Sequence, residues 1–397
     1  MQDYRIETDY IGKKEIPVDA YYGINAARGR ENFSVSDEKI DSVLIKTMAW
    51  TKKACIMANS ECNLISNEIA NALLEACDKI ISGEFDNQFI VNPLQGGGGT
   101  SFNMNANEII TNIALEGLGL KKGDYSTINP LSHVNMSQST NDIFPSSINL
   151  ALIIKIDYIL EVLDKLKDTL LHKSQELKPI FRMGRTHLNA AEPISIGQYF
   201  NACTTQLIRD IRKILQVKEF LKYIPLGGTI IGVGSKASKR YRKCATKNLR
   251  AISGINIKAC PDLIDGIQSV GNYNTLSSFL KECAINLSKM ASDLRLMGSE
   301  SKYGFGDIVL PSRQIGSSFM PEKVNPVIPE LINQISFIVC GYDLSISMAA
   351  QAGQLELNVF KPVISHCLFK MLDIMTESIS LFNKFCLTGI EAKVRKL

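Results

Sequence analysis

Four short segments combine glycine with side chains that can donate hydrogen bonds, and they contain the residues best suited to chemistry. They span residues 99–108, 135–142, 184–187 and 316–326. Each borders an apolar run, so each is predicted to form a loop or a helix terminus. Each also has an ordinary structural explanation when taken singly, such as a helix cap formed by the Ser-Thr-Asn-Asp cluster at 139–142.

Together these segments offer hydroxyl and amide donors, one imidazole and one ammonium group. Carboxylate oxygens only accept hydrogen bonds, so this set suits a small substrate that carries several carboxylates. The neutral donors are Thr100, Ser139, Thr140, Asn141, Thr186 and Ser318, and the other two groups belong to His187 and Lys323.

Several common catalytic patterns are missing from the sequence. The glycine run at 96–99 is not followed by lysine, so it is not a phosphate-binding loop. The chain also lacks a G-x-S-x-G elbow, histidines at metal-ligand spacing and any C-x-x-C pair. We therefore expect neither a metal nor a nucleotide cofactor.

Residues 316–326 match the pattern G-S-S-x-M-P-x-K-x-N-P of the aspartase/fumarase superfamily. The other three segments resemble the remaining active-site regions of that family and follow in the same order. The similarity extends from about Arg5 to Glu391. It implies a long-helix bundle that assembles as a homotetramer, in which each active site draws on three subunits.

Three places within the family distinguish elimination of ammonia from addition of water. The chain has Met136 and Ser139-Thr140 where class II fumarases carry lysine and a double serine. Residues 327–330 read Val-Ile-Pro-Glu, whereas fumarases continue with Thr-Gln. The resemblance therefore implies that L-aspartate is converted to fumarate and ammonia. Hydration chemistry on L-malate is the alternative within the family.

The resemblance also implies a role for each candidate residue. Ser317 would be the general base that takes the Cβ proton, and Lys323 and loop N–H groups would stabilise its oxyanion. The β-carboxylate would be held by Thr100, Ser139, Thr140 and Ser318. Asn141 and His187 would face the amino group, and Thr186, Lys323 and Asn325 the α-carboxylate.

Two departures from the family pattern support a different hypothesis, a weakened paralogue that serves as a binding or structural assembly. Glu322 replaces the usual glycine between Pro321 and Lys323. The resemblance also stops near the end of the bundle, so the small C-terminal domain of the family is expected to be absent. The intact hydroxyl, imidazole and lysine set opposes this hypothesis.

Apolar residues at helical spacing predict the elements that position these segments. Helices are expected over residues 42–62, 67–81, 105–116, 143–177, 194–221, 264–297, 326–357 and 360–382, with extended chain and turns over 1–35. Several of the long helices are apolar on more than one side, as at 148–156, which indicates burial against other subunits. We expect a mainly α fold, with a helical domain at 1–140, a long-helix bundle at 141–388 and a remnant tail at 389–397.

Composition narrows the possible partners and location. The 397 residues include 44 basic and 40 acidic side chains, and the net charge of +4 is spread along the chain. No basic tail is present, so nucleic acid is not an expected partner. No uninterrupted apolar run reaches the ~18 residues of a membrane span, and no signal-peptide core follows Met1. Most of the ten cysteines lie in apolar helical patterns, which favours a cytoplasmic protein with reduced thiols.

Overall fold

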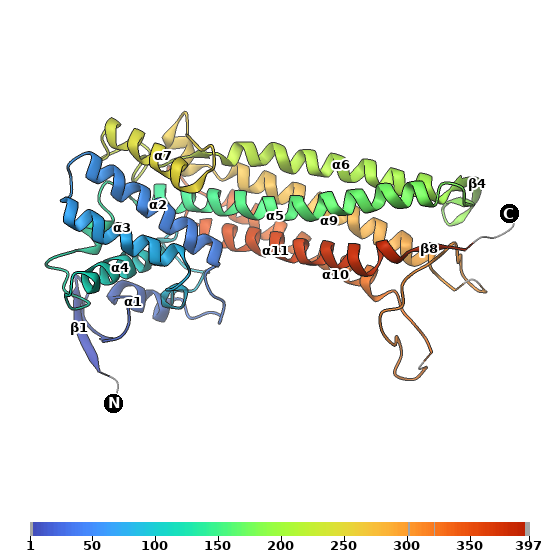
Figure 1. Cartoon of the computed structure of the whole chain (residues 1–397), viewed down its shortest axis with the longest axis horizontal. Coiled ribbons are helices and arrows are strands. Elements are labelled where there is room, and N and C mark those ends of the chain that lie inside the picture. The colour runs from blue at the N-terminus through green and yellow to red at the C-terminus, as the bar shows by residue number, and fades with distance from the viewer. Residues whose placement is uncertain (1–2, 301, 321, 394–397) are drawn as a thin grey trace. The chain divides into compact units, whose positions relative to one another are not determined.

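The structure is a computed structural model of the whole chain, and it describes residues 3–300, 302–320 and 322–393. The chain divides into two compact units. The first contains Met1–Ile154, Glu219–Tyr273 and Ser345–Cys367, and the second contains Lys155–Lys218, Asn274–Leu344 and Leu368–Leu397. The boundaries between the units fall inside the five long helices. These are α5 (Thr140–Glu176), α6 (Ile196–Leu221), α9 (Gly271–Met297), α10 (Val327–Gln351) and α11 (Lys361–Phe385) (Figure 1).

The first unit is built from short and medium helices with two small sheets. Its helices are α1 (Ile24–Asn32), α2 (Ser42–Glu61), α3 (Asn67–Ile81), α4 (Thr100–Gly117), α7 (Lys239–Ser253) and α8 (Leu263–Gln268). Strands β1 (Tyr4–Asp9) and β2 (Gly12–Pro17) form an antiparallel hairpin, while β5 (Tyr223–Ile224) and β6 (Lys258–Ala259) pair in parallel. Helix α2 packs against both α3 and α7, and α4 packs against α3.

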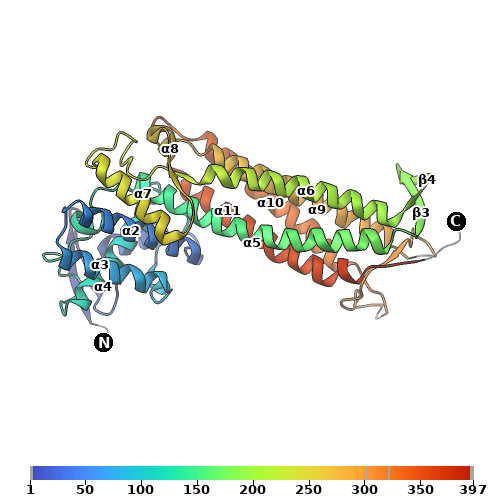
Figure 2. The ribbon, with the colours of Figure 1, turned by 45° about the horizontal axis from the view of Figure 1, so that its top comes forward.

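The second unit is a bundle made by the long helices, which run side by side in both ribbon views (Figures 1 and 2). Leucines at helical spacing supply its core, including Leu163, Leu166 and Leu170 of α5 and Leu287 and Leu294 of α9. The bundle is joined by the hairpin of β3 (Phe181–Thr186) and β4 (Asn189–Ser195) and by the short pair β7 (Ile308–Val309) and β8 (Glu391–Ala392). A long helical bundle is therefore observed, and the predicted mainly α fold is confirmed.

Two helices, α5 and α10, have the length and apolar composition that a membrane span would need. Neither helix contains an uninterrupted apolar run of that length, because each window can include up to two charged side chains. Within the chain, 78% of the most apolar window of α5 is buried, as in the core helix of a bundle. Only 33% of the corresponding window of α10 is buried, and Phe337, Ile338 and Leu344 stay exposed.

Most predicted helices are present, and the extended chain expected near the N-terminus is confirmed over β1 and β2 but wrong over residues 24–32. Residues 24–32 form α1, although its sequence has no strong apolar face. The backbone N–H groups at its start find an acceptor far along the sequence. Glu108 accepts hydrogen bonds from the N–H groups of Gly23, Asn25 and Ala26. Glu7 accepts a further bond from the N–H of Ile24. Buried carboxylates therefore take the place of a local cap.

Some boundaries also differ from the prediction. Helix α4 begins five residues early, at Thr100, and the helix expected over 264–297 is broken into α8 and α9. Helix α10 ends at Gln351 instead of near residue 357. The β3–β4 hairpin and α7 were not predicted. The hairpin is short and mostly exposed, so it lacks the apolar alternation that marks a half-buried strand.

Candidate active site

Thr100 is the first residue of α4 and directly follows the glycine run. Gly99 has a positive φ of 100°, and a Cβ placed there would lie 2.4 Å from the Phe144 ring, so glycine is required. The Thr100 side chain is exposed, and its hydroxyl donates to the carbonyl oxygen of Gly97 at 2.8 Å. The glycine run thus places one exposed hydroxyl at a helix N-terminus.

The second group of candidates, Ser139 to Asn141, is fixed by the buried carboxylate of Asp142. This carboxylate accepts the backbone N–H groups of Ser139 at 2.9 Å, Gly227 at 2.9 Å and Thr229 at 3.1 Å. The Thr140 hydroxyl accepts a bond from the Asn103 amide at 3.1 Å. The Asn141 amide donates to the carbonyl oxygen of Ile230 at 2.8 Å. Burial raises the pKa of Asp142 to about 6.

Behind these residues lies a buried lysine that the sequence reasoning missed. The Lys52 ammonium donates to the side-chain oxygens of Asn135 at 3.0 Å and Gln138 at 2.9 Å. The same Asn135 oxygen accepts the amides of Asn103 and Asn107, each at 3.2 Å. Burial lowers the pKa of Lys52 to about 7. Its position among the apolar residues of α2 could have indicated from the sequence that Lys52 is buried.

Thr186 and His187 lie at the tip of the β3–β4 hairpin. The two turn residues, His187 and Leu188, both have positive φ, 53° and 63°. Two-residue hairpin turns favour this conformation, but glycine or asparagine normally supplies it. Non-glycine residues held there are strained, which is common at functional sites. The side chains of Thr186 and His187 are exposed.

The hairpin contacts the segment that leads into the loop of residues 312–326, here called the signature loop. The Arg185 guanidinium lies 4.2 Å from the centroid of the Phe305 ring. Arg182 lies 3.9 Å from the carboxylate of Asp307. Thr186, His187 and the start of the signature loop therefore belong to one end of the second unit.

The signature loop is closed at its base by hydrogen bonds around Gly316. The Asn325 amide donates to the Gly316 carbonyl at 2.6 Å, and the Gly316 N–H donates to the Lys323 carbonyl at 2.7 Å. Within the loop, the Ser317 hydroxyl oxygen accepts the backbone N–H groups of Phe319 at 3.2 Å and Met320 at 2.9 Å. Two aligned donors on one hydroxyl oxygen would stabilise it as an oxyanion.

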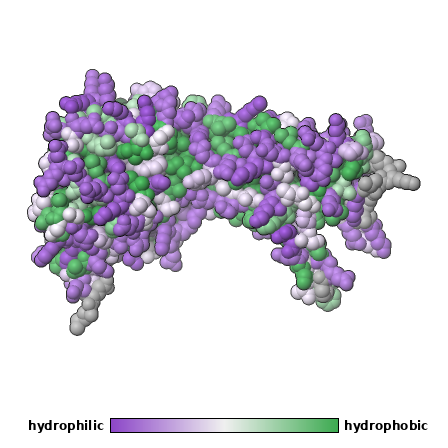
Figure 3. Space-filling model, in the orientation of Figure 1, coloured by the Kyte–Doolittle hydropathy of each residue, from purple (hydrophilic) through white to green (hydrophobic). Residues whose placement is uncertain are grey.

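The outer part of the signature loop is exposed and partly apolar, as the projecting segment in Figure 3 shows. Phe319 is 90% exposed and Ile315 is 68% exposed. Ser318, Glu322 and Lys323 are exposed as well, and Pro321 lies outside the described residues. Within the described part of the chain, the Lys323 ammonium makes no hydrogen bond or ion pair. Lys323 therefore does not contact Ser317 among the described residues, and its support of the Ser317 oxyanion in a closed loop stays a prediction.

The candidate residues fall into two sets. The first unit contains Thr100, Ser139, Thr140 and Asn141, and the second contains Thr186, His187, Ser317, Ser318, Lys323 and Asn325. Within residues 3–300, 302–320 and 322–393, no group of three or more His, Cys, Asp or Glu side chains is arranged to hold a metal ion.

Comparison with known proteins places this arrangement in a family. The model of the Lyase family matches residues 12–341. An aspartate ammonia-lyase from Bacillus sp is 45% identical over 395 residues, which is 100% of this chain and 84% of the relative. The aspartate ammonia-lyase of Escherichia coli (strain K12) is 40% identical over 391 residues, covering 98% of this chain and 82% of that protein.

Two solved structures share the fold. A fumarate lyase:delta crystallin from Brucella melitensis, solved bound to cobalt, superposes with a TM-score of 0.97 at 42% identity, covering 99% of this chain and 86% of that one. A class II fumarase from Schistosoma mansoni gives a TM-score of 0.96 at 29% identity, covering 98% and 85%. This chain is therefore a member of the lyase family that contains these proteins, the aspartase/fumarase superfamily.

Proposed function

We propose that the protein is an aspartate ammonia-lyase, a carbon–nitrogen lyase that converts L-aspartate to fumarate and ammonia. The observation that carries this assignment is the 40–45% identity to several curated aspartate ammonia-lyases over 98–100% of the chain. The class II fumarase, at 29% identity, is more distant. Met136 and residues 327–330, which depart from the fumarase pattern, support the same choice.

In the proposed mechanism Ser317 is the general base. Its oxygen takes the Cβ proton of aspartate, and the electron pair of the C–H bond moves into the β-carboxylate to form an aci-carboxylate. That electron pair then forms the Cα–Cβ double bond while the Cα–N bond breaks and ammonia leaves. The donors from Phe319 and Met320 support this role, because they would stabilise the oxyanion that a serine base requires.

The remaining candidates are assigned to the parts of the substrate. We assign Thr100, Ser139, Thr140 and Ser318 to the β-carboxylate, whose charge grows after the proton leaves. Donors aimed at that growing charge lower the barrier, because they bind the transition state more strongly than the substrate. Asn141 and His187 are assigned to the amino group, and Thr186, Lys323 and Asn325 to the α-carboxylate.

We further propose a cytoplasmic homotetramer with active sites shared between subunits. The exposed apolar side chains of α10, including Phe337, Ile338 and Leu344, support burial against another copy of the chain. The match of residues 316–326 to the aspartase/fumarase pattern supports shared sites, because the resemblance implies that each site draws on three subunits. The free thiols of all ten cysteines fit a reducing compartment.

Ultraviolet absorbance of fumarate tests the assignment directly. Purified protein is mixed separately with L-aspartate, L-malate and argininosuccinate, and we expect fumarate from L-aspartate alone. Faster formation from L-malate would assign the chain to the fumarases. No turnover of any of the three would favour the weakened paralogue, the hypothesis that Glu322 raises.

A further inference from the structure

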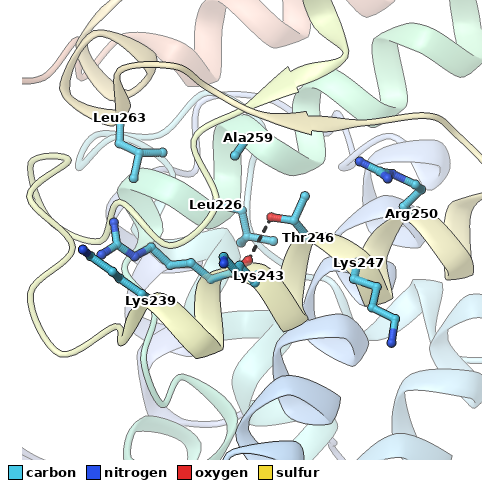
Figure 4. Close-up of a pocket in the computed structure, with 9 residues that line it drawn as sticks. Leu226, Lys239, Lys243, Thr246, Lys247, Arg250, Ala259 and Leu263 are labelled. Carbon is cyan, nitrogen blue, oxygen red and sulfur yellow. Dashed lines mark hydrogen bonds between the residues drawn. The ribbon is translucent and has the colours of Figure 1, made fainter.

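A hollow of about 450 Å³ lies along α7, and none of the proposed catalytic residues lines it. In Figure 4, side chains from successive turns of α7 rise on one side, while Ala259 and Leu263 face them from the segment that follows. The hollow is lined by Leu226, Lys239, Arg242, Lys243, Thr246, Lys247, Arg250, Ala259 and Leu263. Its volume is in the range of small-molecule sites, about 300–1,000 Å³.

The side of this hollow formed by α7 is strongly cationic. Helix α7 contains six basic and no acidic residues, although the whole chain carries a net charge of only +4. Lys239, Arg242 and Lys243 follow the i, i+3, i+4 spacing of one helix face. Within the described residues, none of these three has a carboxylate at ion-pair distance. Their charge is therefore available to an anion.

These cations occupy positions that local helix stability does not favour. The N-terminus of a helix carries partial positive charge, so acidic residues stabilise the first turn and basic residues oppose it. Helix α7 begins with Lys239-Arg240 and has no acidic residue in its first turn. Its N-terminus is satisfied by the Ser238 hydroxyl, which accepts the Tyr241 N–H at 3.1 Å. The basic residues thus do not stabilise the N-terminus of α7, which is consistent with a role in binding an anion.

Arg242, the central cation, is held by its surroundings. A Cβ at Gly227 would lie 2.3 Å from the Arg242 Cγ, and a Cβ at Gly234 would lie 3.2 Å from its Cζ. Both glycines have positive φ, 85° and 74°, so the loop they form leaves room for this side chain. Arg250, at the far end of the hollow, donates two hydrogen bonds to the Ile257 carbonyl at 2.6 and 3.1 Å. Two of the cations are therefore fixed before any ligand arrives.

Nearby carboxylates are already engaged. Glu61 accepts the Asn248 amide at 2.8 Å, and that bond is the largest cause that lowers its pKa. The Lys247 ammonium lowers the Glu61 pKa further, so the positive charge of Lys247 is partly offset by Glu61. Asp262 caps α8 by accepting the N–H groups of Ile264 and Asp265 at 2.8 and 3.2 Å. Arg240, which does not line the hollow, also acts on Glu61. Lys239, Arg242 and Lys243 are left without a carboxylate partner among the described residues.

The geometry points to a binding site for a small phosphorylated ring compound, such as a nucleoside polyphosphate. Lys239, Arg242 and Lys243 provide the charge-assisted donors that phosphate oxygens bind. Leu226, Ala259 and Leu263 provide an apolar floor for the ring. The limited volume of the hollow and this floor favour a compact ligand over an extended nucleic acid, which would need a longer basic track.

Isothermal titration calorimetry of the full chain at low salt tests this site, with magnesium-free ATP and inorganic tripolyphosphate as probes. ATP is expected to bind at least ~10-fold more tightly than tripolyphosphate, because only ATP has a ring for the apolar floor. In the variant Lys239→Gln, Arg242→Gln, Lys243→Gln, ATP affinity should fall at least ~10-fold, because three charge-assisted contacts are lost.

A matched variant controls for total charge. Lys13→Gln, Lys121→Gln and Lys178→Gln remove three exposed lysines outside the hollow, and ATP affinity should stay within ~2-fold of wild type. Equal losses in the two triple variants would overturn the site, as would the absence of ATP binding to wild type. Equal affinity for ATP and tripolyphosphate would overturn the role of the apolar floor. Tighter binding of a short single-stranded oligonucleotide would reassign the surface to nucleic acid. The single variant Lys243→Gln, at an exposed position, repeats the test if the triple variant folds poorly.

Discussion

The two sets of candidate residues differ in how firmly the chain holds them. In the first unit, Ser139, Thr140 and Asn141 rest on a buried network that includes Asp142 and Lys52. In the second unit, the hydrogen bonds that close the signature loop lie at its base, around Gly316, and Arg313 stacks on Phe385. Its outer residues are exposed, including the apolar Phe319 and Ile315.

This contrast indicates a division of labour within the proposed active site. Donors for a substrate carboxylate must be in place before the charge forms, and a hydrogen-bonded network provides that. The loop that carries Ser317 must admit substrate and then exclude water, so it gains from fewer fixed contacts. Exposed apolar side chains on such a loop are suited to packing against other surfaces once it closes.

The largest expected effect comes from the loop that carries the proposed base. Replacing Ser317 with alanine should lower kcat by about 10²–10⁴-fold, the usual contribution of a general base. Folding should be unchanged, because the Ser317 hydroxyl bonds to backbone N–H groups of its own loop. The decrease in kcat is measured by the ultraviolet absorbance of the fumarate formed from L-aspartate. Ser312→Ala, an exposed serine of the same loop, is the matched control, and equal activity in the two variants would remove Ser317 from the role of base.

Replacing Glu108 tests how firmly the first unit is held, through the free energy of unfolding. Its carboxylate accepts three backbone N–H groups and the Asn25 amide. Glu108→Ala leaves these buried donors without an acceptor, so unfolding in urea should require about 1–3 kcal/mol less free energy. Glu75→Ala removes an exposed carboxylate from α3 and should change stability little. Similar losses in the two variants would contradict the capping role.

Lys52 should make the free energy of unfolding of the first unit's buried network depend on pH. Burial lowers its pKa from 10.5 to about 7, so the folded state binds fewer protons than the unfolded state between these values. Its contribution to stability is present above pH 10.5 and is lost as pH falls through about 7. Between pH 7 and 9, stability of the wild type should therefore rise by about 2 kcal/mol relative to Lys52→Met.

Urea denaturation at several pH values measures this difference. Lys46→Met, which removes an exposed lysine from the same helix, should keep the wild-type dependence. Parallel curves for wild type and Lys52→Met would show that Lys52 is not held in the environment described.

The smallest effect is expected at Glu322, an exposed residue of the signature loop. Its charge and side chain oppose tight packing of the closed loop, so Glu322→Gly should raise kcat/KM by up to ~10-fold, which corresponds to about 1.4 kcal/mol on closing. Steady-state kinetics with L-aspartate measure the change. An unchanged or lower kcat/KM would show that Glu322 does not limit closure.

The sequence predicted the parts of this molecule that local signals determine. Helix α3 has the predicted bounds, and the Ser66 hydroxyl caps it by accepting the Ile69 N–H. The signature loop and its serine followed from a long family pattern. Helix α1 could not be predicted, because the carboxylate that caps it, Glu108, lies more than 80 positions along the chain. The network around Lys52 likewise joins segments that only the fold brings together.

Subunit complementation tests most directly whether the two sets form one site shared between chains. Ser317→Ala disables the signature loop, and Thr140→Val removes a hydroxyl from the rigid set. We expect each variant alone to be weakly active or inactive. If the two sets meet across subunits, mixed tetramers that form at equal ratio should regain activity in about a quarter of their sites, because each set is intact in half of the chains. Mixed tetramers that stay as inactive as the separate variants would contradict the shared site.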